Sequence, residues 1–181
     1  DRFLEQNPGA TSLPPIVPIV VHHGDHGWQA PRELRDLIDL ASLPPEIREF
    51  LAPLQPNLRF LIDDLALVPE AELRERTGTL MHRLTHLLLQ FVRPATERDP
   101  VEFVQRWRDL MLALWHHPGG RAGIYALFSY LASQLEAPPE RLAAAGALIH
   151  EDVRTMGKSI AEQCREEGMQ KGRRQGKVEG K

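Results

Sequence analysis

The apolar residues that follow Pro69 recur at helical intervals, and this periodicity constrains the fold more than any other feature of the sequence. Leucine and aromatic residues are three, four or seven positions apart, which places them on one face of a helix. Prolines and glycines divide the pattern into three stripes and a fourth, alanine-rich helix, at residues 73–91, 104–115, 124–135 and 139–149. We therefore expect a helical region over residues 67–156. Its core should contain four large aromatic side chains: Trp107, Trp115, Phe128 and Tyr130.

Two short apolar segments nearer the N-terminus predict β-strands instead. The segment at residues 15–22 is β-branched and too short for a helix, and its apolar side chains on both faces are typical of an interior strand. Pro18 lacks an amide donor, so either one ladder bond is missing there or the strand begins at Ile19. A second strand is predicted at residues 57–63. Together with two short helical segments between them, at residues 31–40 and 45–51, these strands predict an α+β fold whose sheet belongs to residues 1–66.

The C-terminal residues 157–181 form a tail in which glycine recurs at every fourth position. The glycines are Gly168, Gly172, Gly176 and Gly180. Each glycine costs about 1 kcal/mol relative to alanine inside a helix, so one interpretation is a frayed polar tail. The other is a helix whose glycine ridge allows a second helix to approach closely. Because the flanking residues are charged, that partner would be a soluble chain, most simply a second copy, and the tail then predicts a homo-oligomer.

Charge is unevenly distributed along the chain, whose net charge is −3. Residues 168–181 contain five basic residues and one acidic residue, a net charge of +4, which leaves −7 for the rest. A basic tail on an acidic body is suited to contact with an acidic surface, either nucleic acid or another subunit. The candidate contacts with nucleic acid are Lys171, Arg173, Arg174 and Lys177.

The cysteine content and the hydropathy favour a soluble protein of the cytoplasm. The single cysteine, Cys164, cannot form an intramolecular disulfide, which indicates a reducing compartment. No apolar run approaches the roughly 20 residues that a membrane-spanning helix needs, so we expect no membrane partner.

Histidine and aspartate residues gather where the first strand should end. His22, His23, Asp25 and His26 follow it closely, at a position where loops of such sheets often bind ligands. Four potential ligands this close together could hold a transition metal. The alternatives are a role at the edge of a cleft and ordinary packing at the strand end.

Other polar pairs lead to no complete active site, so no catalytic residue is assigned. His82 and His86 share a helix face, but the zinc-protease motif requires glutamate where Arg83 stands. Asp63 and Asp64 end the second strand, where they would either bind a divalent ion or cap the following turn.

Four segments, in this order, resemble the recombination-promoting nuclease (Rpn) or YhgA-like putative transposase family, which belongs to the PD-(D/E)XK nuclease superfamily. They are LPPIVPIVVHHGDHGW at residues 13–28, APRELRDLIDL at 30–40, NLRFLIDDLALVPEAEL at 57–73, and the tail with SIAEQ at 159–163 and its Glu-Gly repeats. The Tyr-His-Gly of the family is His22-His23-Gly24 here, which leaves any role of the tyrosine without a counterpart.

The resemblance implies an activity for an intact enzyme rather than for this chain. The metal-binding Asp and Glu-x-Gln/Lys of the superfamily would precede Asp1, so we expect a C-terminal fragment that needs no cofactor of its own. The intact enzyme would use Mg²⁺ to hydrolyse phosphodiesters of DNA, its partner. The first hypothesis is therefore the C-terminal portion of a metal-dependent DNA endonuclease. The alternative is a non-catalytic oligomerisation or regulatory module that pairs through the helical region and the tail.

Overall fold

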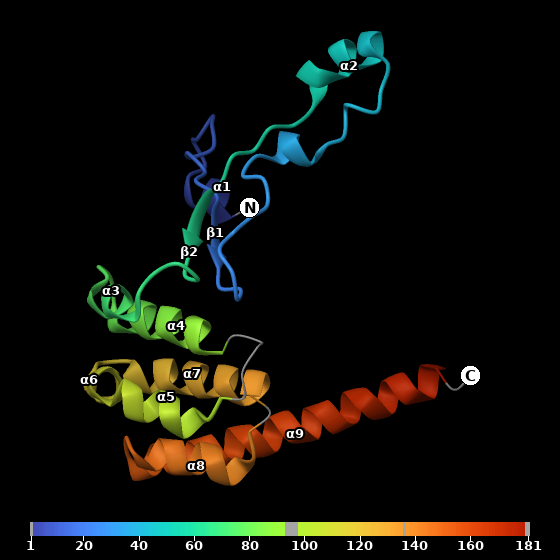
Figure 1. Ribbon diagram of the computed structural model, residues 1–181. Helices are drawn as coiled ribbons and strands as arrows, with labels where there is room; N and C mark the ends of the chain where they lie inside the picture. The colour runs from blue at the N-terminus through green and yellow to red at the C-terminus, as the bar shows by residue number, and fades with distance from the viewer. Residues whose placement is uncertain (1, 93–97, 136, 180–181) are drawn as a thin grey trace. The chain divides into compact units, whose positions relative to one another are not determined.

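The computed structural model describes residues 2–92, 98–135 and 137–179, and only the backbone at residues 2, 4 and 175–179. The described chain forms two compact units. The first unit comprises Asp1–His22 and Gly27–Asp64, and the second comprises His23–His26 and Leu65–Lys181. Strands occur in the first unit and long helices in the second, so the predicted α+β class is confirmed (Figure 1).

The first unit is built around two parallel strands. Strand β1 (Ile19–His22) pairs with β2 (Leu61–Asp64), and the register places Ile19 opposite Leu61 and His22 opposite Asp64. The remaining elements of this unit are short: α1 (Arg2–Gln6), the 3₁₀ turn η1 (Leu34–Leu37), α2 (Pro45–Leu51) and the 3₁₀ turn η2 (Ala52–Leu54).

Both predicted strands are present but shorter than expected. Strand β1 begins at Ile19, because Pro18 has no amide hydrogen; the carbonyl of Pro18 instead accepts a hydrogen bond from the Leu61 amide at 3.0 Å. The residues before β2 pair elsewhere, since Arg59 forms an isolated antiparallel bridge with Glu33. That bridge also explains why the helix expected at residues 31–40 is reduced to the single turn η1.

The expectation that the first strand is covered on both faces is wrong for the described chain. The Ile19 side chain is 60% exposed and that of Val21 is 42% exposed. Alternate residues of a strand point to opposite faces, and Val20 and His22 are the half-buried ones. The described residues place two strands in this sheet, and they leave one side-chain row of β1 uncovered.

The second unit is a bundle of helices that follow one another along the sequence. They are α3 (Glu70–Glu75), α4 (Leu80–Phe91), α5 (Pro100–Arg106), α6 (Arg108–His116), α7 (Gly120–Leu135), α8 (Pro139–Ala147) and α9 (Glu151–Glu179).

Two of the predicted helical stripes are interrupted. The stripe at residues 73–91 is divided by Gly78, whose φ of +128° favours glycine, and by Thr79, whose hydroxyl caps α4 by accepting from the His82 amide at 3.1 Å. The stripe at residues 104–115 is divided at Trp107, which ends α5 with φ −120° and ψ 31°. The apolar spacing continues across both breaks, so periodicity alone did not reveal them.

The core of the second unit contains two of the four predicted aromatic residues. Phe128 is fully buried, and Trp107 is 3% exposed with its indole N–H donating to Glu70 Oε1 at 2.9 Å. Trp115 and Tyr130 are partly buried and pack against the edge of this core. Burial of each large apolar side chain contributes roughly 1.5–3 kcal/mol, so the two central rings are major sources of stability.

The tail is helical, so the frayed alternative is wrong for its described part. Helix α9 passes through Gly157 without a break, and Ile160 and Ala161 are buried. A Cβ on Gly157 would lie 2.7 Å from the Leu142 carbonyl oxygen, which shows how closely α9 crosses α8. Residues 165–174 are all exposed, and the second half of α9 extends beyond the helices that it packs against (Figure 1).

Candidate functional site

A histidine and an aspartate meet where the two parallel strands end. His22 and Asp64 are opposite one another in the ladder, and His22 Nδ1 lies 2.9 Å from Asp64 Oδ1. An ionised carboxylate only accepts hydrogen bonds, so Nδ1 is the donor of this pair. In a neutral ring, Nε2 then carries the lone pair. The carboxylate therefore orients His22 and fixes its tautomer, as carboxylates do for functional histidines.

Asp64 also holds the segment that follows β1. Its Oδ2 accepts a hydrogen bond from the Trp28 amide at 2.6 Å. The Trp28 ring meets the rings of His22 and Phe60 edge to face, with centroids 5.4 Å and 5.9 Å away. Both carboxylate oxygens are thus engaged. We name these four residues, His22, Trp28, Phe60 and Asp64, the strand-end cluster.

The remaining candidates from the histidine-rich segment lie differently. His23 is half-buried, and its enclosed Nδ1 has no hydrogen-bond partner among the described residues, whereas Asp25 and His26 are exposed. Within the described ranges, no group of three or more His, Cys, Asp or Glu side chains is arranged to hold a metal. His22 instead contacts Asp64, a pairing that the sequence pattern did not predict. Metal binding at residues 22–26 stays a prediction.

His82 and His86 lie against one another on α4, with ring centroids 4.1 Å apart. His86 is buried, and its Nδ1 lies 2.9 Å from Arg76 Nη1. Arginine only donates, so Nδ1 accepts and the neutral ring carries its hydrogen on Nε2. No lone pair of His86 is then left for a metal, and the shared helix face does not make a metal site.

The predicted tail residues lie on the exposed half of α9. Lys171, Arg173 and Arg174 are exposed, and the side chain of Lys177 is outside the described residues. A Cβ added to Gly168 or Gly172 would meet open space. Gly176 belongs to the helical backbone and Gly180 is outside the described residues, so the glycine ridge is described only in its first half.

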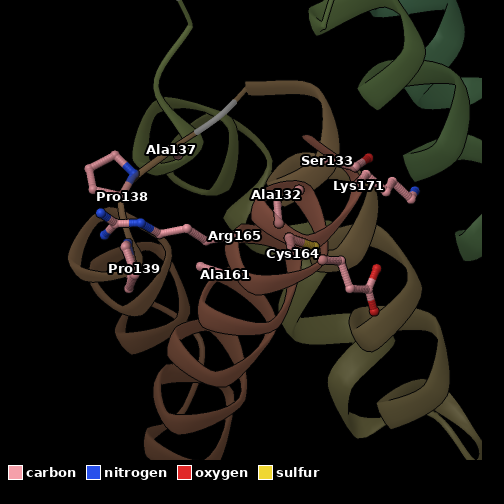
Figure 2. A pocket seen from close by; sticks show the side chains of 11 residues that line it. Ala132, Ser133, Ala137, Pro138, Pro139, Ala161, Cys164, Arg165 and Lys171 are labelled. Carbon is pink, nitrogen blue, oxygen red and sulfur yellow. The ribbon is translucent and has the colours of Figure 1, made fainter. Parts of the chain in front are cut away.

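A groove lies beside the middle of α9, and sequence reasoning missed it because it joins segments far apart in the chain. It has a volume of about 600 Å³ and is bounded by the end of α7, the start of α8 and α9. Figure 2 shows Cys164, Arg165 and Lys171 of α9 among its lining side chains. Its other lining residues are Ala132, Ser133, Ala137, Pro138, Pro139, Ala161, Glu167 and Gly168.

These observations define a mostly helical α+β protein with a His–Asp pair at the ends of two parallel strands and a basic terminal helix. The profile of the family described as putative transposase, YhgA-like, matches residues 1–118. The chain belongs to this family. The match includes the strand-end cluster, whereas the groove and the basic half of α9 lie beyond it. No curated protein and no solved structure matches the chain. Among the helices of the described ranges, none has the length and apolar character to cross a bilayer.

Proposed function

We propose that this chain is the C-terminal portion of a metal-dependent DNA endonuclease of the recombination-promoting type and performs no catalysis itself. The proposal rests on the resemblance of the four sequence segments, two of which meet in the strand-end cluster. His22 and Trp28 come from one segment that carries the resemblance, and Phe60 and Asp64 from another. Because both segments lie within the matched family region, their contact indicates that the motifs maintain one structural feature.

We assign no magnesium ligand among the described carboxylates. Mg²⁺ requires octahedral oxygen ligands, usually one or two carboxylates with waters and phosphate oxygens. Both oxygens of Asp64 are already engaged, because they accept hydrogen bonds from His22 and Trp28. We assign the strand-end cluster a positioning role: Asp64 holds Trp28 against the ends of β1 and β2. The carboxylates that bind Mg²⁺ in the intact enzyme would be supplied from upstream of Asp1.

The reading frame upstream of Asp1 tests this proposal. We expect it to encode an aspartate on one strand and Glu-x-Gln/Lys on the next. The product of that frame should nick supercoiled DNA with Mg²⁺ and not with EDTA, and replacement of its glutamate by glutamine should abolish nicking. The 181-residue chain should leave the DNA intact. A start codon directly before Asp1, or cleavage by the 181-residue chain, would contradict the proposal.

A second candidate function is self-association, and the open positions beside Gly168 and Gly172 favour it. A helix from a second copy could approach these positions without meeting side chains. Sedimentation of the whole chain should give a mass above that of the monomer. A chain ending at Glu167 should be monomeric, and it keeps the buried Ile160 and Ala161. Equal masses for the two chains would exclude pairing through the tail.

A further inference from the structure

We infer that α9 pairs with α9 of a second copy in antiparallel orientation, with the partner helix lying along the groove beside Cys164. This inference rests on the proposed self-association through the tail. It adds the orientation of the helices, their register and the ion pairs that select them.

The described residues leave the second half of α9 uncovered. Residues 165–174 are exposed, and the helix nevertheless continues to Glu179. Each glycine in this half costs the helix about 1 kcal/mol relative to alanine. The groove provides an apolar wall for a second helix, formed by Ala132, Ala137 and Pro138.

The charges of α9 select the antiparallel orientation. Residues 161–167 contain three glutamates and one arginine, a net charge of −2, whereas residues 168–178 contain four basic residues and no acid, a net charge of +4. Parallel pairing would place like blocks side by side. Antiparallel pairing about a two-fold axis places each acidic block against the basic block of the other copy.

The residues that line the groove set the register. Cys164, Gly168 and Lys171 all line it and share one stripe of α9, which Gln175 continues by helical spacing. Glu167 also lines the groove, one helical turn before Lys171. A two-fold axis between these two residues places Glu167 of each copy beside Lys171 of the other. In this register Cys164 lies near Gln175 of the second copy.

A charge swap in the full chain tests the ion pairs. We expect Glu167→Lys and Lys171→Glu each to weaken dimerisation about tenfold or more, because each places like charges together. The double variant E167K/K171E should restore dimerisation. Glu166→Lys makes the same charge change one residue away and outside the groove lining, so it should weaken dimerisation less than Glu167→Lys does. Sedimentation equilibrium measures the affinity, and circular dichroism verifies that each variant is folded. Failure of the double variant to recover would overturn the register.

Disulfide trapping in the full chain tests the orientation. Under mild oxidation, Gln175→Cys should give a covalent dimer that joins Cys164 of one copy to the introduced thiol of the other. The unsubstituted chain, with Cys164 as its only cysteine, should stay unlinked, because antiparallel pairing separates the two thiols by roughly 15 Å along the helix. Adding Cys164→Ser to the Gln175→Cys variant should remove the link.

The outcomes separate this inference from the proposals on which it rests. A dimer whose Cys164 residues link to each other is parallel and overturns the orientation, while self-association stands. A chain that is monomeric at all concentrations overturns both. Neither result bears on the nuclease assignment, which depends on DNA cleavage by the longer reading frame.

Discussion

Asp64 connects residues that are far apart in the sequence but adjacent at the ends of the strands. Its carboxylate accepts from the His22 ring and from the Trp28 amide. Hydrogen bonds to a charged group are each worth about 1.5–3 kcal/mol, which makes Asp64 the principal polar contact described at this edge.

Replacement of Asp64 should therefore loosen the segment after β1. We expect Asp64→Ala to accelerate hydrogen exchange at the Trp28 amide by about tenfold or more, because a bond worth at least about 1.4 kcal/mol is removed. Asp64→Asn should have a smaller effect, since its carbonyl oxygen still accepts one of the two bonds. Asp36→Asn is the control, because Asp36 is exposed in η1. Unchanged exchange in Asp64→Ala would show that the Trp28 amide is protected by other contacts.

The sequence predicted which residues lie at this site, but not that His22 and Asp64 contact each other. His22 and Asp64 were each expected at the end of a strand, and both are there. Their contact depends on the parallel register, which the hydrophobic pattern of two short strands does not specify. Trp28 carried no chemical signal of its own; it was visible only as part of a family segment.

Burial at Tyr130 predicts a change of stability in alkaline solution. Desolvation raises the pKa of the Tyr130 hydroxyl above its ordinary value of 10.0. In the unfolded chain this group ionises first as the pH rises, so its contribution is fully present below about pH 10 and is lost as the pH rises towards the folded pKa. The free energy of unfolding from urea titrations should therefore fall less steeply above about pH 10 in Tyr130→Phe than in the unsubstituted chain. Parallel slopes would contradict this assignment.

At the scale of the elements, the glycines of α9 fall into two structural classes. Gly157 lies at the crossing with α8, where a Cβ would be 2.7 Å from a backbone oxygen and 3.2 Å from the Phe128 ring. Gly172 has open space in the same position. Gly157 therefore differs in structural role from Gly172: it allows α8 to approach closely, whereas Gly172 faces open space.

Replacement by alanine should destabilise the fold at Gly157 but stabilise the helix at Gly172. We expect Gly157→Ala to lower the free energy of unfolding by about 1–3 kcal/mol, the usual cost of overpacking, because the Leu142 carbonyl must shift. Gly172→Ala should raise the helicity of the dilute monomer, since alanine is favoured over glycine by about 1 kcal/mol. Thermal and urea denaturation followed by circular dichroism distinguish them. A stabilised Gly157→Ala would mean that α8 and α9 are not closely packed.

The sequence predicted the identity of most elements but not where they are interrupted. Both strands and the helical region follow from their hydrophobic periods, and the start of β1 follows from Pro18. The break at Trp107 could not be predicted, because the residue is apolar and in phase with its neighbours. Its buried ring and its bond to Glu70 maintain a backbone that departs from the helix. Tertiary contacts outweighed local periodicity there.

At the scale of the whole molecule, α9 offers different charges on different sides. Lys171 lines the groove, and Arg173 lies about 200° further around the helix. In the antiparallel pair, Lys171 would be covered by the second copy, whereas Arg173 would remain available to another anionic surface. Pairing and DNA contact could then use the same helix without competing.

Arg173 should therefore contribute more to DNA binding than to pairing. We expect Arg173→Ala to weaken binding of the chain to duplex DNA and to reduce its salt dependence by about one counterion, with a smaller loss of dimerisation than Lys171→Glu causes. Lys158→Ala is the control, because Lys158 is an exposed lysine that lies outside the basic block. Fluorescence anisotropy at several salt concentrations measures both quantities. An equal loss in the two variants would show that the basic block has no special role.

Family membership followed from the order of the sequence segments, whereas the groove did not. Each segment is continuous in the chain and can be recognised by its residues. The groove combines the end of α7, the start of α8 and one side of α9. Such a surface exists only after the helices have packed, and no local sequence pattern predicts it.

The uncovered side-chain row of β1 should affect the solubility of this polypeptide in a cell. The exposed side chains of Ile19 and Val21 add apolar surface through which copies of the chain can aggregate. Produced by itself, the chain should be a client of chaperones and proteases, and at high expression it should collect in inclusion bodies. The substitution Val21→Lys should move it into the supernatant. The yields of soluble protein from the unsubstituted chain and from this variant then measure how far the exposed side chains of β1 cause aggregation.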